Sequence, residues 1–113
     1  AEVYTAHDGS TLFVGVLVRD EFIDTGSANP FQNDAVELFI DGDRAAGDYP
    51  RFGPGNNEGF QLAVDAAGRK FTNATTFANA AWAGVARRSA GGYVVEFAIP
   101  FSLIDTQDGP GFT

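Results

Sequence analysis

The stretch Thr11-Leu12-Phe13-Val14-Gly15-Val16-Leu17-Val18-Arg19 alternates between two kinds of position. Every second residue, from Leu12 to Val18, is branched and aliphatic, whereas the residues between them are mixed. A hydrophobic period of two is typical of a β-strand that buries one of its faces. Residues 2–6 predict a partner strand, because the intervening His7-Asp8-Gly9-Ser10 contains the Asp-Gly pair that closes β-hairpins.

The same alternation returns along the rest of the chain. It predicts strands over residues 35–41 and 60–64, a short return strand at 70–72, and a hairpin of 82–88 with 93–99 that ends at Pro100. Short strands between turn residues, without a helical period, predict an all-β fold: an antiparallel β-sandwich of two sheets, as in immunoglobulin or jelly-roll domains. The residues expected in its core are Val14, Val16, Val36, Leu38, Ile40, Tyr93, Val95 and Ile99.

Length and charge narrow the possible functions. The 113 residues fit a single domain, residues 1–113, with a hydrophobic share of 44%. A net charge of -8, from 15 acidic and 7 basic side chains, repels phosphate backbones and anionic lipids, so we expect no nucleic-acid partner. We expect no membrane insertion either, because no apolar run approaches the roughly 18 residues of a spanning helix. Neutral polyols and divalent cations remain compatible partners.

The residue types that are absent or rare exclude further classes. The chain has no cysteine, which excludes disulfides, thiolate catalysis and iron–sulfur clusters. Its single histidine, His7, stands before a turn and provides no catalytic triad. A single lysine, Lys70, among abundant Asp, Asn, Gly and Thr favours an extracellular protein, secreted or on the cell surface. Because the chain opens directly on an alternating segment, we expect it to be a piece of a longer protein.

Residues 27–41 resemble the signature of the family 9 carbohydrate-binding modules. They read Ser-Ala-Asn-Pro-Phe-Gln-Asn-Asp-Ala-Val-Glu-Leu-Phe-Ile-Asp, where the family has N-P-W-x-x-D-x-V-E-[IL]-F-I-D. Residues 11–20 resemble the family's L-Y-V-x-V…V-x-D strand, and residues 91–100 resemble its G-G-Y-x-V-E-x-x-I-P strand. The resemblance covers residues 12–101 and implies a β-sandwich, truncated here at both ends, that binds oligosaccharides or polysaccharides, often with structural calcium.

The resemblance also implies where a sugar would bind. Phe31 stands where the family has the first of two facing tryptophans, and the second falls in a C-terminal region that this sequence does not contain. Phenylalanine is a smaller stacking surface than tryptophan, and the alternative is that Phe31 plugs one end of the core. Glu37 carries over as a carboxylate that accepts sugar hydroxyls, and Gln61 and Asn33 carry over as further polar contacts.

Two acidic clusters are candidate calcium sites, because calcium prefers several carboxylate oxygens. Each cluster follows a predicted strand: they are Asp41, Asp43 and Asp48, and Asp20, Glu21 and Asp24. Asp-Gly-Asp is also a common sequence in turns, and the spacing of ligands in an EF-hand is missing. The clusters therefore predict either calcium ligands or turn residues.

Two function hypotheses follow. The first is a non-catalytic glycan-binding module of a secreted or surface protein, accompanied by neighbouring domains of the parent chain. The second is a structural or adhesive spacer of the same fold that binds no sugar. A third class, an enzyme, would need Glu37 and Glu96 as a carboxylate pair for glycoside hydrolysis. No deep cleft is indicated, and the resemblance makes both positions structural or ligand-facing, so we expect no catalysis.

Overall fold

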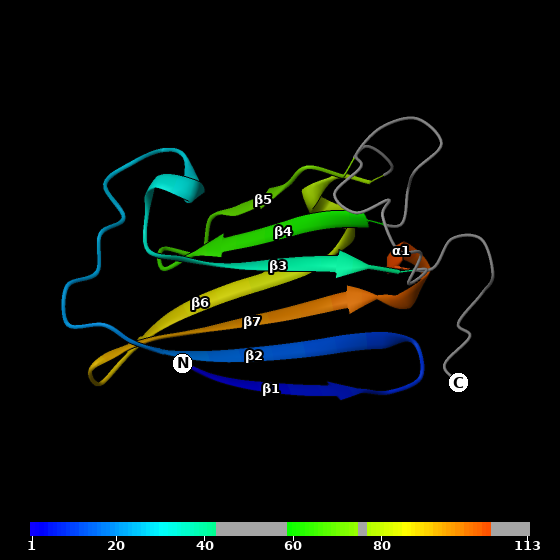
Figure 1. Ribbon diagram of the computed structural model, residues 1–113, viewed down its shortest axis with the longest axis horizontal. Helices are drawn as coiled ribbons and strands as arrows, with labels where there is room; N and C mark the ends of the chain where they lie inside the picture. The colour runs from blue at the N-terminus through cyan, green and yellow to red at the C-terminus, as the bar shows by residue number, and fades with distance from the viewer. Residues whose placement is uncertain (43–58, 75–76, 105–113) are drawn as a thin grey trace.

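The computed structural model describes residues 1–42, 59–74 and 77–104, which form two packed antiparallel β-sheets (Figure 1). The first sheet has the strand order β1-β2-β7-β6 and the second has the order β3-β4-β5. The strands are β1 (Glu2–His7), β2 (Thr11–Arg19), β3 (Ala35–Asp41), β4 (Gly59–Asp65), β5 (Lys70–Thr72), β6 (Ala83–Ser89) and β7 (Gly92–Pro100). The described helices are short: η1 (Pro30–Gln32), η2 (Asn79–Ala81) and α1 (Phe101–Ile104). The predicted all-β sandwich is confirmed.

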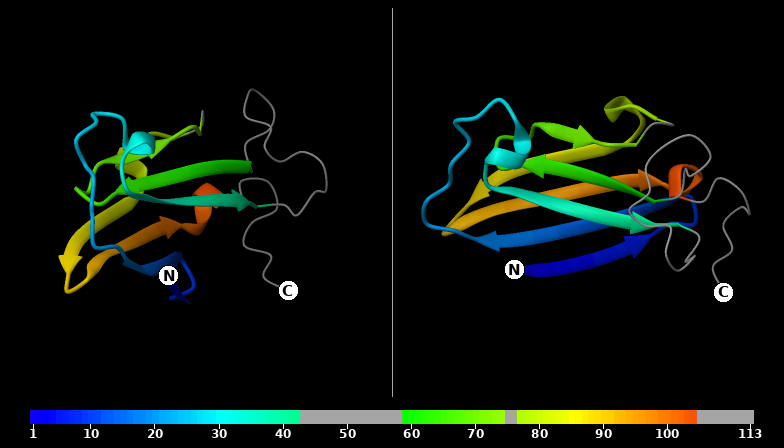
Figure 2. Two further views of the ribbon diagram at one scale, coloured as in Figure 1. Left: turned by 60° about the vertical axis from the view of Figure 1, so that its left-hand side comes forward. Right: turned by 45° about the horizontal axis from the view of Figure 1, so that its top comes forward.

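The core lies between the inward faces of the two sheets (Figure 2). Of the residues predicted for it, those on β2 and β7 are buried, whereas those on β3 are half-buried and pack against the same cluster. The buried ones are Val14, Val16, Tyr93, Val95 and Ile99, and the half-buried ones are Val36, Leu38 and Ile40. The difference has a topological reason, because among the described strands β3 is at the edge of its sheet and has β4 as its one neighbour.

The hairpin turns of the first sheet depend on glycines with positive φ. Gly9 (φ 94°) lies between β1 and β2, and Gly91 (φ 78°) lies between β6 and β7. At the first turn, the Asp8 carboxylate accepts the backbone N–H groups of Ser10 and Thr11 at 3.0 and 2.9 Å. These are the two hairpins that the Asp-Gly and Gly-Gly pairs predict.

The strand limits agree closely with the predicted ones. β1 continues one residue further, to His7, and β6 runs from Ala83 to Ser89 instead of from Trp82 to Arg88. Trp82, 3% exposed, is the residue after η2 and precedes β6, and its ring stacks against Phe97 in the core.

The chain crosses from the first sheet to the second through residues 20–34, which carry η1 (Figure 2). This loop meets the turn between β4 and β5, where the Asp34 carbonyl accepts the backbone N–H of Ala66 at 2.8 Å. The contact brings η1 to the end of β4 and over the outer face of the second sheet. Within the described part of the chain, no helix has the length and hydrophobicity to cross a bilayer.

Candidate functional site

The outer face of the second sheet brings together side chains from four separate segments. Glu37 on β3 is directly opposite Ala63 on β4, and Ala63 is directly opposite Phe71 on β5. Opposed residues of an antiparallel ladder project from the same face of the sheet, so these three lie in one row. Phe31 of η1 packs against Phe71 at the end of that row. We call the set Phe31, Glu37, Phe39, Gln61 and Phe71 the platform face.

Local sequence holds Phe31 on this face. The Asn29 side chain accepts the backbone N–H of Phe31 at 3.0 Å, and Pro30 occupies the first turn of η1, where a missing N–H is tolerated. The Phe31 ring meets Phe71 edge-on, with centroids 4.2 Å apart and planes at 66°. Phe31 remains 38% exposed and is not a member of the core cluster. It therefore lies on the outer face of the sheet and is not a plug of the core.

Polar groups lie beside this aromatic pair. Glu37 is exposed, and two strand spacings, about 10 Å, separate its backbone from that of Phe71. Gln61 on β4 is half-buried, and the residue opposite it, Phe39, is 58% exposed. The platform face thus combines an apolar surface with a directed acceptor, and these are the two kinds of contact that a sugar ring with its hydroxyls requires.

Asn33 lies near this face, but its side chain is engaged within the protein. Its Nδ2 donates to the Ser27 carbonyl at 2.8 Å and to Asp65 Oδ2 at 3.0 Å, and its Oδ1 accepts the Ser27 N–H at 2.9 Å. Both donor hydrogens of the amide are used in this way. The structure therefore gives Asn33 a structural role, and its sugar contact stays a prediction.

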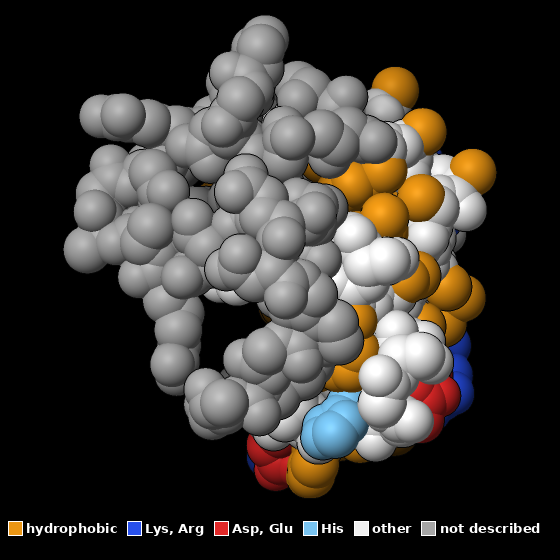
Figure 3. Space-filling model, turned by 90° about the vertical axis from the view of Figure 1, so that its right-hand side faces the viewer, with side chains coloured by type: hydrophobic (Ala, Val, Ile, Leu, Met, Phe, Trp, Pro, Cys, Tyr) orange, Lys and Arg blue, Asp and Glu red, His pale blue; other side chains and the backbone are white. Residues whose placement is uncertain are grey.

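The first predicted calcium cluster is described only in part. Asp41, the last residue of β3, is exposed, whereas Asp43 and Asp48 lie outside the described residues. Figure 3 views the end of the sandwich at which β3 finishes. The coloured surface there is mainly hydrophobic and uncharged, with red carboxylates near its lower edge. Calcium binding by this cluster stays a prediction.

The second predicted cluster has the geometry of turn residues. Asp20 Oδ1 accepts the backbone N–H of Phe22 at 3.0 Å, and Asp24 Oδ1 accepts that of Gly26 at 2.9 Å. Across residues 1–42, 59–74 and 77–104, no three Asp, Glu or His side chains are grouped so that they could hold a metal ion. Asp20 and Asp24 therefore act as turn residues, and calcium binding by this second cluster, with Glu21, stays a prediction.

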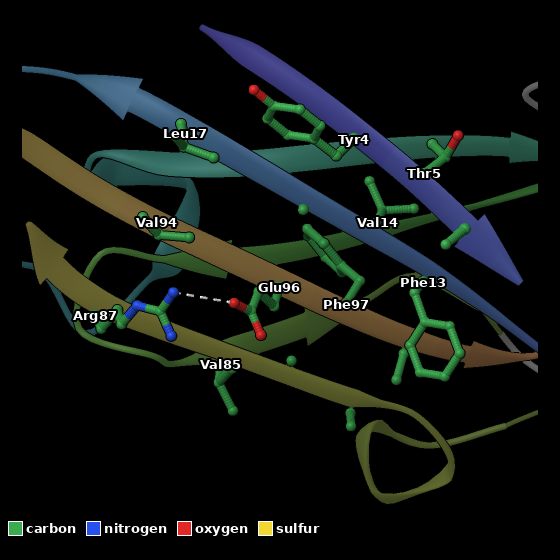
Figure 4. Close-up of a pocket in the computed structure, with 15 residues that line it drawn as sticks. Tyr4, Thr5, Phe13, Val14, Leu17, Val85, Arg87, Val94, Glu96 and Phe97 are labelled. Carbon is green, nitrogen blue, oxygen red and sulfur yellow. Dashed lines mark ion pairs between the residues drawn. The ribbon is translucent and has the colours of Figure 1, made fainter.

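Glu96 lies on the opposite side of the sandwich from Glu37. It projects from the outer face of the first sheet, where Arg87 Nη2 contacts its carboxylate at 3.3 Å (Figure 4). The pair lies in an open groove of about 550 Å³ whose lining, which includes Tyr4 and Phe13, is otherwise largely apolar. Carboxylates on opposite outer faces cannot flank one glycosidic bond, so Glu37 and Glu96 are not a hydrolytic pair.

Two members of the platform face were not predicted as site residues. Residues 70–72 are predicted only as a return strand, and Phe71 gave no separate signal because a three-residue strand is too short to show a period. Phe39, in contrast, did give a signal in the sequence. It is an aromatic residue at an outward position between the inward Leu38 and Ile40, and an exposed apolar side chain of this kind marks a candidate contact surface.

Comparison with known proteins agrees with the β-sandwich fold. The family model described as "Carbohydrate family 9 binding domain-like" matches residues 1–112, and no curated protein matches the chain. Two solved structures of a carbohydrate binding module family 9 from Caldicellulosiruptor kristjanssonii share the fold. The one in complex with cellotriose has a TM-score of 0.69 and 22% identity, and the one in complex with glucose has a TM-score of 0.67 and 21% identity.

Each of these comparisons covers 87% of this chain but only 47% or 48% of the other chain. The chain therefore spans about half the length of the solved structures that it matches. At these identities the structures show the fold alone, whereas the family model extends over almost all of the sequence. The chain belongs to the carbohydrate family 9 binding domain-like family.

Proposed function

We propose that the chain is a non-catalytic carbohydrate-binding module whose platform face binds a neutral oligosaccharide or polysaccharide. The observation that carries this proposal is the exposed ring of Phe31, held on Phe71 two strands away from the Glu37 carboxylate. Membership of the family supports it, as do the related structures, which are complexes with cellotriose and glucose. We therefore take a glucose-based oligosaccharide as the first ligand to test.

The platform face would divide recognition between its apolar and polar groups. The Phe31 ring contacts the apolar face of a pyranose through dispersion and C–H contacts. Glu37 accepts hydroxyl hydrogens, since an ionised carboxylate can take two donors at once, and Gln61 adds a neutral contact. A neutral sugar is not repelled by a chain with a net charge of -8, which distinguishes it from anionic ligands.

We further propose that the module works outside the cell, in a secreted or surface protein whose neighbouring domains share its target. The acidic, lysine-poor composition and the carbohydrate-binding family support this location. Structural calcium is part of the same proposal, with Asp41, Asp43 and Asp48 as the candidate ligands.

Isothermal calorimetry with cello-oligosaccharides and xylo-oligosaccharides tests the proposed site. We expect Phe31→Ala to weaken binding by about 1 to 3 kcal/mol, the value of burying an aromatic side chain, and Glu37→Gln to weaken it by losing a charged acceptor. Tyr4→Ala is the matched control, because Tyr4 is an exposed aromatic residue on β1 and lines the groove of the first sheet. If the unmodified chain binds no sugar, the spacer hypothesis replaces this one. If both site variants bind as tightly as the unmodified chain, the platform face is the wrong site.

A further inference from the structure

Asp65, the last residue of β4, is a buried carboxylate outside the hydrophobic core. Its side chain is 0% exposed, and among the described residues it is the one polar or charged residue that is buried. Burying a carboxylate is costly unless the charge is paired and its oxygens accept hydrogen bonds. The partners that Asp65 binds therefore show which parts of the structure depend on it.

The two carboxylate oxygens serve different segments. Oδ1 accepts the backbone N–H groups of Ala67 and Arg69 at 3.0 and 2.8 Å, which closes the turn between β4 and β5. Oδ2 accepts Asn33 Nδ2 at 3.0 Å and Arg69 Nε at 2.8 Å. The backbone N–H groups of the turn use only Oδ1, and Oδ2 is the oxygen that ties the sheet to the loop before β3.

Through its two partners, Oδ2 reaches both sides of the loop that carries Phe31. Arg69 donates from Nη2 to the Thr25 carbonyl at 2.6 Å, on the side where the chain enters the loop. Asn33, on the side where the chain leaves, holds both the N–H and the carbonyl of Ser27. Phe31 lies between these anchored positions, so its place above the sheet depends on them.

We infer that Asp65 is a positioning residue of the sugar site: its Oδ2 fixes the loop of residues 25–33 and so keeps Phe31 on Phe71, beside Glu37. This inference rests on the proposed function of the platform face. Asp65 itself is buried and does not contact the sugar. The benefit is preorganisation, because a loop that is already ordered loses less conformational entropy when the ligand binds.

Hydrogen exchange on Asp65→Asn tests the positioning without any sugar. The substitution keeps the size of the side chain but removes the charge. It also replaces Oδ2 with an NH2 group, which cannot accept the hydrogen bonds from Asn33 Nδ2 and Arg69 Nε. We expect the amides of Ser27 and Phe31 to exchange at least about tenfold faster, while amides in the centre of β4 keep their protection. Unchanged protection in the loop would overturn the inference.

Two variants keep this test decisive. Asp8→Asn is the matched control, because Asp8 also accepts two backbone N–H groups at a turn, but at the β1–β2 hairpin, and it should leave the loop unchanged. If Asp65→Asn does not fold, Asn33→Ala removes one of the two links between Oδ2 and the loop, while the link through Arg69 and the two Oδ1 bonds of the turn remain. Asn33 is itself the acceptor of the Ser27 N–H, so the readout in this variant is the Phe31 amide. It should exchange faster, and its full protection would overturn the inference.

Calorimetry with cellotriose then separates positioning from a merely structural effect. We expect Asp65→Asn to weaken binding about tenfold in the unmodified background and far less in a Phe31→Ala background, because residues that act as a unit are not additive. Equal losses in both backgrounds would show that Asp65 acts independently of Phe31 and would overturn the inference. If the unmodified chain binds no cellotriose, the proposed function fails, and the exchange experiment alone decides whether Asp65 holds the loop.

Discussion

Phe31 and Phe71 form one aromatic pair from two separate parts of the chain, with ring centroids 4.2 Å apart. Phe31 comes from the loop between the sheets, whereas Phe71 comes from β5, a three-residue strand at the edge of the second sheet. Each ring packs against the other. Among the described strands β5 has β4 as its one neighbour, so Phe31 of the loop provides the contact that Phe71 lacks on its other side. The stacking surface is therefore the pair and not Phe31 alone.

Truncation of the supporting ring should weaken sugar binding. We expect Phe71→Ala to reduce the affinity for cello-oligosaccharides by about 0.5 to 1.5 kcal/mol, the value of an aromatic pair, because Phe31 loses the ring that orients it. In calorimetry, the double variant Phe31→Ala/Phe71→Ala should lose less than the sum of the two single losses. Phe13→Ala, on β2 and lining the groove of the first sheet, serves as the control and should bind normally. Strictly additive losses would mean that the two rings act separately.

The strands could be predicted from the sequence because alternation reports burial directly, whereas the roles of Phe31, Glu37 and Gln61 in sugar binding stay predictions. The sequence does not show which polar residues that are distant in the chain contact one another. Asn33 could not be distinguished from a ligand contact, because the Asp65 carboxylate that engages it follows another strand. Asp65 stands next to a turn in the sequence, and nothing in the sequence shows that its Oδ2 also reaches Asn33.

Two glycines of the first sheet should respond in opposite ways to alanine. A Cβ on Gly92 would overlap the backbone carbonyl of Val18 on the neighbouring strand, and backbone cannot move aside as a side chain does. We expect Gly92→Ala to lower the free energy of unfolding by at least about 1 to 3 kcal/mol, measured by urea denaturation.

Gly15 provides the matched comparison for Gly92. A Cβ there would meet nothing within 4 Å. Gly15→Ala should therefore be neutral or stabilise the chain by up to about 1 kcal/mol, because glycine in a strand interior is unfavourable. If both variants are equally destabilised, the close approach of Gly92 to Val18 is not what requires a glycine there.

Chelation should lower the melting temperature if the cluster of Asp41, Asp43 and Asp48 holds calcium. An ion that binds only the folded state adds stability by mass action, about 2.7 kcal/mol at a hundred times its Kd. We expect excess EDTA to shift the melting curve down, excess calcium to restore it, and Asp41→Asn to reduce the shift. A melting curve that EDTA leaves unchanged would remove calcium from the proposed function.

Acid should destabilise the chain partly through Asp65. Burial alone raises the pKa of this carboxyl, but hydrogen bonds from the Arg69 backbone, Asn33 and the Arg69 guanidinium, together with the charge of Arg69, outweigh burial and hold the pKa below its usual 3.8. The unfolded state then binds more protons than the folded state, so the free energy of unfolding falls as the pH falls. This contribution is complete well above pH 3.8 and is lost as the pH drops through the folded pKa.

Urea denaturation at a series of pH values from neutral to acid measures this contribution. We expect the stability of the unmodified chain to fall more steeply below about pH 4 than that of Asp65→Asn, which has no carboxyl to titrate at this position. Asp8 also has a lowered pKa, through hydrogen bonds from the backbone of Ser10 and Thr11, so part of the acid dependence belongs to it. Asp8→Asn removes that part and should retain the part that belongs to Asp65. If the unmodified chain and Asp65→Asn lose stability in parallel, the carboxylate of Asp65 is not the group whose protonation weakens the fold.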